Sequence, residues 1–249
     1  MSHTPIGNII AGPVPIVVGT ISSREALECF GTVPKDLCDV AEVRLDEIGE
    51  FDGWIEACER IESVGVPTMT TIRLASEGGK WARRSNERLA LFDRAIKTLA
   101  AVDVEFKSDI LKDVSSQAKA MGKAVIVSFH DFNETPTESS LLEVIKSAAE
   151  HATVVKVSTM VRTESDIATL KGLLDADFGV PLCVIGMGAL GTRTRTAFPV
   201  LGSALTYGYL DAPSAPGQLP ATILVDYLRL NLPAYNQQFV VRKEILEFA

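Results

Sequence analysis

A regular alternation of strand-like and helix-like runs constrains the fold of this chain more than any other feature of its sequence. The strand-like runs are short and rich in β-branched residues, whereas the helix-like runs space their apolar residues three and four apart. We predict strands at 15–21, 39–46, 67–73, 101–106, 123–130, 153–160, 181–187 and 204–210. Helices are expected to begin near residue 22 and to lie at 52–63, 85–100, 110–121, 138–150, 163–177, 193–201 and 219–230.

This series predicts an α/β fold, a single-domain (β/α)8 TIM barrel. Strand–helix units recur at roughly 25–30-residue intervals, and 249 residues is close to the ~250 that are typical of such a barrel. No linker-like change of composition interrupts the series. We therefore assign residues 1–249 to one barrel domain, with a short N-terminal segment at 1–13 and a C-terminal tail at 233–249 that has no assigned role.

The composition restricts the classes of function. Hydrophobic residues make up 47% of the chain and charged residues 22%, enough to bury a large core. A net charge of −8 argues against nucleic acid or an anionic membrane as a partner, and no apolar run is as long as a membrane span. The cysteines form no C-x-x-C pair and no metal-ligand spacing with histidine: Cys29, Cys38, Cys58 and Cys183. We expect a cytoplasmic protein with reduced thiols and no structural metal.

One lysine stands in the middle of an apolar strand. Residues 153–160 are mostly β-branched, and Lys156 has no acidic residue within two positions on either side. Burial in apolar surroundings disfavours the charged ammonium and lowers the pKa of a lysine. The free amine can then form a Schiff base with a carbonyl compound. The alternative is that Lys156 lies near the strand end and extends its amine to water.

Charged residues gather where the predicted strands end. In a barrel, the chemistry takes place at the carboxyl ends of the strands and in the loops that follow them. The charged side chains at these positions are Glu42, Arg44, Asp46, Arg73, Glu77, Asp103, Glu105, His130 and Asp131. Each could form a structural ion pair, and His130 alone could be a hydrogen-bonded core residue. Several buried charges that converge on a lysine instead favour a catalytic site.

A glycine motif at 186–191 fits the G-x-G-x-x-G pattern of dinucleotide-binding proteins. That motif normally opens a doubly wound sheet, but here only one further strand is predicted after it. The basic residues Arg193 and Arg195 follow directly. In a barrel, the loops after the seventh and eighth strands commonly bind an anion, which explains the glycines without a nucleotide.

Taken together, the motifs resemble the type I 3-dehydroquinate dehydratase family of the shikimate pathway. The resemblance runs in order from Glu42 to Gln218, and the strand–helix series around it covers nearly the whole chain. Ile185 stands where some members carry methionine, and the tail has no counterpart in the family pattern. The matching segments are 42–46, 71–73, 77–80, 128–132, 135–136, 155–160, 187–195, 202–208 and 214–218.

The resemblance implies a lyase, without metal or cofactor, that converts 3-dehydroquinate to 3-dehydroshikimate. Lys156 would form an imine with the substrate ketone, His130 would act as general acid and base with a pKa near its ordinary value, and Glu77 would orient His130. Arg195 would bind the substrate carboxylate. The remaining substrate-binding residues would be Glu42, Arg44, Arg73, Ser214 and Gln218, with residues 211–218 as a lid.

Two other functions would use parts of the same pattern. A class I aldolase barrel shares the buried lysine, but usually acts on phosphorylated substrates and would not need Glu42, Arg44, Ser214 and Gln218 together. A barrel that only binds a small acid would not need both Lys156 and His130. The sequence does not decide the oligomeric state, and a homodimer is among the assemblies that it leaves open.

Overall fold

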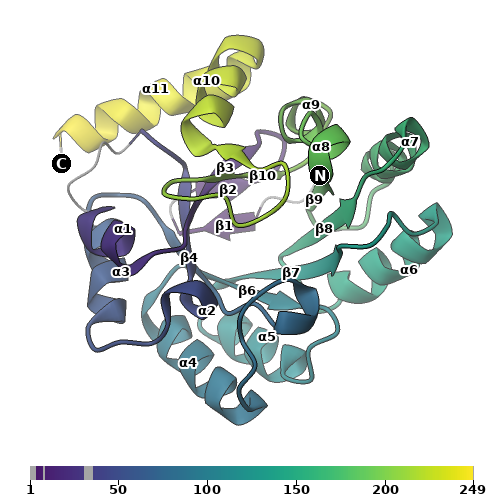
Figure 1. Ribbon diagram of the computed structural model, residues 1–249. Helices are drawn as coiled ribbons and strands as arrows, with labels where there is room; N and C mark the ends of the chain where they lie inside the picture. The colour runs from purple at the N-terminus through teal and green to yellow at the C-terminus, as the bar shows by residue number, and fades with distance from the viewer. Residues whose placement is uncertain (1–3, 8, 31–35, 249) are drawn as a thin grey trace.

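A computed structural model describes residues 4–7, 9–30 and 36–248, and its centre is one parallel sheet (Figure 1). The strand order is β11-β10-β3-β4-β5-β6-β7-β8-β9, so from β3 to β9 each strand lies beside the next one in the chain. The strands are β3 (Ile16–Ile21), β4 (Val40–Arg44), β5 (Thr68–Thr71), β6 (Ala101–Glu105), β7 (Ala124–Asp131), β8 (Val154–Met160), β9 (Leu182–Met187), β10 (Leu205–Tyr209) and β11 (Leu219–Pro220).

The sheet curls until β9 and β10 meet. The amide of Ala204, just before β10, donates to the carbonyl of Leu182 in β9 at 2.8 Å. The hydroxyl of Ser203 also accepts from the amide of Val184 in β9 at 3.0 Å. Because β10 also pairs in parallel with β3, the strands from β3 to β10 surround a common interior. The predicted (β/α)8 fold class is confirmed.

Helices cover the outside of this sheet (Figure 1). Within the described ranges, no helix is long and apolar enough to cross a membrane. The helices are α1 (Arg24–Cys29), α2 (Leu45–Ile48), α3 (Trp54–Ser63), α4 (Ser85–Thr98), α5 (Leu111–Ala120), α6 (Glu138–Ala149), α7 (Glu164–Gly172), α8 (Gly188–Gly191), α9 (Thr194–Val200), α10 (Ala221–Asn231) and α11 (Pro233–Phe248), with short 3-10 turns η2 (Ala75–Glu77) and η3 (Leu173–Asp175).

Most predicted boundaries differ from the structure by one or more residues, as two examples show. The strand predicted at 39–46 ends at Arg44, and the chain turns at once into the short helix α2. The helix predicted at 163–177 begins with a capping box between Thr163 and Asp166, but α7 ends at Gly172 and a 3-10 turn follows. Helix ends fray into such tighter turns, which the apolar spacing does not reveal.

The N-terminal segment closes one end of the barrel interior. Strands β1 (Thr4–Ile6) and β2 (Ile9–Ala11) form an antiparallel pair. Ile6 and Ala11 are buried in one cluster with residues from the starts of the barrel strands, such as Ile16 and Val154. The hairpin thus keeps water from the apolar half of the interior, while the polar residues lie at the opposite, carboxyl end.

The C-terminal tail, which had no assigned role, forms α11 and packs beside α10 (Figure 1). The hydroxyl of Tyr235 donates to Asp39 at 2.9 Å, and Arg242 forms an ion pair with the same carboxylate. Asp39 is buried just before β4 and also accepts from the amide of Val17 at 2.7 Å. The tail therefore neutralises a buried charge at the amino end of the barrel, far along the chain from Asp39.

Candidate active site

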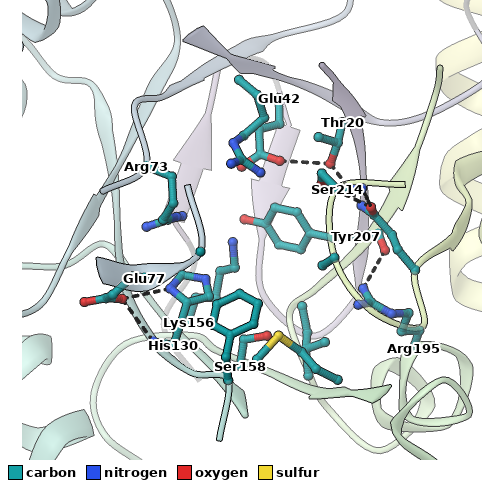
Figure 2. A pocket seen from close by; sticks show the side chains of 17 residues that line it. Thr20, Glu42, Arg73, Glu77, His130, Lys156, Ser158, Arg195, Tyr207 and Ser214 are labelled. Atoms are coloured by element: carbon teal, nitrogen blue, oxygen red, sulfur yellow. Dashed lines mark hydrogen bonds and ion pairs between the residues drawn. The ribbon is translucent and has the colours of Figure 1, made fainter. Parts of the chain in front are cut away.

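A pocket with about 480 Å³ of empty volume opens at the carboxyl ends of the strands (Figure 2). Strand after strand contributes a side chain to it, as the barrel geometry predicts. All nine residues predicted for the site line this pocket: Glu42, Arg44, Arg73, Glu77, His130, Lys156, Arg195, Ser214 and Gln218. The structure thus brings together residues that are up to 176 positions apart, from 42 to 218.

Lys156 lies in the middle of β8, with 6% of its surface exposed. Its Nζ atom is 3.2 Å from Oδ2 of Asp103 on β6 and 3.9 Å from the ring centroid of Tyr207 on β10. The expectation that Lys156 has apolar surroundings is therefore wrong. The acidic partner is not a neighbour in the chain but comes from a strand two positions away in the sheet.

Asp103 links Lys156 to Arg73. Its Oδ1 atom accepts from Arg73 Nη2 at 2.8 Å and from the Ser128 hydroxyl at 2.6 Å. Burial alone would raise the pKa of Asp103, but the charges of Arg73 and Lys156 outweigh burial and hold the pKa well below its usual range. Asp103 is therefore a permanent negative charge beside the amine of Lys156.

His130 lies near the end of β7, opposite Ser158 of the neighbouring strand β8 and two positions further along the strands than Lys156. Its Nδ1 atom is 3.0 Å from Oε2 of Glu77, and its backbone amide donates to the same oxygen at 3.1 Å. An ionised carboxylate can only accept hydrogen bonds, so Nδ1 carries the proton and Nε2 is left as the basic nitrogen. While it is ionised, Glu77 thus holds the ring in one orientation and favours one tautomer.

The pKa of His130 differs from the prediction, which placed it near the ordinary value for histidine. Burial, together with the nearby charges of Arg73 and Lys156, lowers the pKa of His130 well below 6.5, so the ring is neutral at neutral pH. Burial also raises the pKa of Glu77 to about 7, against the opposing effect of Arg73. The site therefore offers a neutral imidazole that is ready to accept a proton.

Arg195 is a buried cation, with 2% of its surface exposed. Nε donates to the carbonyl of Gly217 at 3.0 Å and Nη1 to the carbonyl of Tyr207 at 2.9 Å. Among the residues that the structure describes, no carboxylate lies within ion-pair distance of Arg195, and burial lowers its pKa to about 10. A buried guanidinium without a carboxylate partner has the charge and the geometry to bind an anion. Arg193, in contrast, is exposed and pairs with Glu164.

The segment at 211–218 lies over Arg195. Its Ser214 amide donates to the Gln218 side chain at 2.7 Å, and Gln218 Nε2 donates to the Thr20 hydroxyl at 3.3 Å. The carbonyl of Pro216 accepts from the amide of Gly188 at 3.1 Å. The glycine motif at 186–191 thus packs against this segment, in a sheet that is not doubly wound. The dinucleotide interpretation of the motif does not fit this fold.

Two further predicted residues form the wall near β4. Glu42 accepts from the Thr20 hydroxyl at 2.9 Å and from the Thr71 hydroxyl at 2.7 Å. Arg44 donates two hydrogen bonds to Asp46, at 2.9 and 2.8 Å. Burial opposes the charge of Asp46, but its hydrogen bonds with Arg44 lower the pKa of Asp46 overall. The polar groups of this wall are therefore held in fixed positions by hydrogen bonds within the protein.

Comparison with known proteins agrees with the resemblance noted in the sequence. The family model for type I 3-dehydroquinase matches residues 14–232. This chain belongs to the type I 3-dehydroquinase family. It is 32% identical over 219 residues to a 3-dehydroquinate dehydratase of Methanocella arvoryzae, an alignment that covers 88% of this chain and 97% of that relative.

Solved structures of the family share the fold. The 3-dehydroquinate dehydratase of Aquifex aeolicus is 26% identical, with a TM-score of 0.75 over 87% of this chain and 99% of the other. The type I enzyme of Clostridium difficile, solved with covalently modified comenic acid, has a TM-score of 0.81 at 24% identity over 95% of this chain and 98% of the other. The latter comparison supports the fold alone.

In this type I 3-dehydroquinase, several groups that line the pocket or contact Lys156 were not among the predicted catalytic or substrate-binding residues. Asp103 had a signal, because it and Glu105 are charged residues on one face of a strand that is otherwise apolar. Tyr207 lies in the matching segment 202–208, but an aromatic residue in a strand usually belongs to the core, so no role was assigned to it. Thr20 and Ser158 also line the pocket. Their small side chains are common on any strand, so neither was given a role, although Ser158 lies in the matching segment 155–160.

Proposed function

We propose that this enzyme converts 3-dehydroquinate to 3-dehydroshikimate through a Schiff base on Lys156, with His130 as general acid and base. The main support is that three groups line one pocket: a buried lysine amine, a neutral imidazole within hydrogen-bond distance of Glu77, and a buried arginine with no carboxylate partner among the described residues. The relatives named 3-dehydroquinate dehydratase support the choice of substrate. Metal and organic cofactors have no part in the proposed steps.

The first step is the addition of the Lys156 amine to the substrate ketone. The amine must be unprotonated to attack, and loss of water from the resulting carbinolamine leaves a positively charged iminium nitrogen. Asp103, ionised and 3.2 Å from Nζ, would stabilise that positive charge. The iminium then serves as an electron sink for the neighbouring ring carbon.

In the second step, Nε2 of His130 takes a proton from the carbon between the iminium carbon and the carbon that bears the leaving hydroxyl. The electron pair moves to the iminium nitrogen and gives an enamine. His130 then donates the same proton to the hydroxyl, which leaves as water while the electrons return to form the conjugated iminium. Water hydrolyses this iminium, which releases the enone product and restores the amine. Ionised Glu77 would stabilise the transient imidazolium.

Substrate binding in this proposal uses the rest of the pocket. The carboxylate would bind to Arg195, and the ring hydroxyls would face the other polar walls. The residues proposed to contact them are Glu42, Arg44, Arg73, Ser214 and Gln218. Residues 211–218 would act as a lid that excludes water from the reacting atoms. We further propose a cytoplasmic location, since Cys38, Cys58 and Cys183 are buried thiols that form no disulfide.

The direct test of this function is to mix the enzyme with 3-dehydroquinate and follow the ultraviolet absorbance of a conjugated enone. The proposal requires absorbance to rise in proportion to enzyme concentration. An aldolase would cleave a carbon–carbon bond without forming this chromophore, and a binding protein would leave the spectrum unchanged. Either of these results would overturn the proposed function.

Replacing Arg195 with alanine is expected to weaken substrate capture more than chemistry. A charge-assisted hydrogen bond contributes about 1.5–3 kcal/mol, so the KM should rise roughly 10- to 150-fold. Turnover should persist at high substrate concentration because Lys156 and His130 remain. The matched control is Arg193→Ala, which removes an exposed guanidinium two positions away and should leave KM unchanged. The assignment would be wrong if the two variants exchanged these phenotypes.

The pH dependence of kcat/KM should report the ionisation of Glu77. Its pKa is raised to about 7, so this carboxyl gains a proton as the pH falls through that value and no longer stabilises the charged form of His130. We expect kcat/KM to fall on the acid side with a midpoint near 7. Protonation of free His130 cannot produce this limb, because the His130 pKa lies well below 6.5.

Glu77→Gln isolates the influence of Glu77 ionisation on kcat/KM, since glutamine keeps the shape of the side chain but is neutral at every pH. This variant should show a lower kcat/KM, with no acid limb near pH 7. An unchanged midpoint in Glu77→Gln would assign the ionisation to another group. A steady-state profile measured in buffers of constant ionic strength would distinguish the two outcomes.

A further inference from the structure

Tyr207 carries a buried hydroxyl that the described protein does not satisfy. The residue lies on β10, lines the active-site pocket and is 4% exposed. Its hydroxyl has no hydrogen-bond partner among the residues that the structure describes. An unpaired buried hydroxyl costs stability, and phenylalanine would fill the same space without that cost. The hydroxyl is therefore available to form a hydrogen bond with a ligand that enters the pocket.

We propose that the Tyr207 hydroxyl binds the substrate hydroxyl on the ring carbon next to the ketone, and so selects substrates that carry it. This inference rests on the proposed function, because it takes 3-dehydroquinate as the substrate and Lys156 as the residue that attacks its ketone. No role was predicted for Tyr207 from the sequence.

The position of the ring supports this assignment. The Nζ atom of Lys156 lies over the Tyr207 ring, 3.9 Å from its centroid, so the phenol oxygen is within reach of atoms adjacent to the imine carbon. In Figure 2 the Tyr207 hydroxyl points toward the side of the pocket that holds Arg73, and away from Arg195. The hydroxyl and the proposed carboxylate site thus face different ends of the substrate.

The substrate has a matching arrangement of groups. In 3-dehydroquinate, the carbon with the carboxylate lies two ring positions from the ketone on one side, and the two other hydroxyl-bearing carbons lie on the opposite side. If Lys156 takes the ketone and Arg195 the carboxylate, the hydroxyl-bearing edge is directed away from Arg195. The first hydroxyl on that edge is the one next to the ketone, and it meets the Tyr207 side of the pocket.

The Tyr207 hydroxyl keeps all of its hydrogen-bonding capacity within the described protein, whereas neighbouring polar groups have used part of theirs. Glu42 accepts hydroxyl hydrogens from Thr20 and Thr71, and Arg73 donates to Asp103 and Ser128. Burial, with the nearby charges of Asp103 and Glu42, raises the pKa of Tyr207 well above its ordinary value. The phenol therefore stays neutral and can both donate to and accept from a substrate hydroxyl.

The test is Tyr207→Phe, assayed with 3-dehydroquinate and with an analogue that has hydrogen in place of the hydroxyl next to the ketone. We expect kcat/KM for 3-dehydroquinate to fall roughly 5- to 100-fold, the range for losing one buried hydrogen bond. The analogue should react equally well with both proteins. In the absence of substrate, Tyr207→Phe should unfold at the same or a higher temperature than the unmodified protein, because it removes an unpaired hydroxyl.

Three results would overturn the proposal. Unchanged kcat/KM for 3-dehydroquinate would mean that the hydroxyl does not contact the substrate. An equal loss for both substrates would mean that it acts by positioning Lys156, and a lower unfolding temperature would mean that it has a structural partner. Tyr209→Phe, on the same strand but outside the pocket lining, is the matched control.

Reductive trapping separates a failure of the Tyr207 proposal from a failure of the proposed function. If the unmodified protein forms neither adduct nor enone, the proposed function itself fails.

Discussion

Replacing Lys156 with methionine is expected to abolish the dehydration of 3-dehydroquinate, lowering kcat at least ~10⁴-fold, because no covalent intermediate can form. Methionine approximates the length of lysine and suits a buried position. Asp103 would keep its hydrogen bonds to Arg73 and Ser128, so the fold should survive. The measurement is enone formation under substrate saturation, with the circular dichroism spectrum as a check on folding.

The matched control is Lys107→Met. Lys107 and His130 line a second, neighbouring pocket at the same end of the barrel, but Lys107 does not line the active-site pocket. Its replacement should leave kcat within a few-fold of the unmodified enzyme. If the folded Lys156→Met protein kept near-native turnover, the amine of Lys156 would not be the nucleophile.

Replacing His130 with alanine should separate imine formation from elimination. General acid–base catalysis contributes typically ~10²–10⁴-fold, so turnover should fall by at least that factor. The Lys156 amine and its partner Asp103 remain, so the substrate should still form an imine, although more slowly if His130 assists proton transfer in that step. Adduct should therefore accumulate, and reduction followed by intact-mass measurement would detect it.

Two results would contradict this role for His130. Near-native turnover in His130→Ala would mean that another group takes the proton, with Glu42 as the next candidate in the pocket. A variant that binds substrate but never forms an adduct would place His130 in the imine step instead. Glu77→Gln is the milder comparison, because it leaves the imidazole in place and removes only the carboxylate charge.

The periodic features of the fold were predictable from the sequence. Alternating apolar patterns reveal buried strands and amphipathic helices, because each residue type must match the face on which it lies. The same reasoning placed Lys156 and His130 on adjacent parallel strands, near the end where barrels carry their sites. The family motifs then selected Glu77 and Arg195 from the many charged residues, which periodicity alone could not do.

The features that were not predicted depend on contacts between distant parts of the chain. Lys156 looked isolated because its partner Asp103 is 53 residues away, and only the sheet order brings the two together. The tail had no apparent role because Arg242 reaches Asp39 across the length of the barrel sequence. The lowered pKa of His130 is likewise a consequence of burial beside Arg73 and Lys156, neither of which is near it in the chain.

The central claim is that catalysis passes through an imine on Lys156, and reductive trapping tests it most directly. The enzyme would be mixed with 3-dehydroquinate and borohydride, digested, and mapped by mass spectrometry. We predict one stable adduct, on the peptide that contains Lys156, and none in Lys156→Met. An adduct on Lys107, Lys123, Lys146 or another lysine, or full turnover with no trapped adduct, would contradict the mechanism.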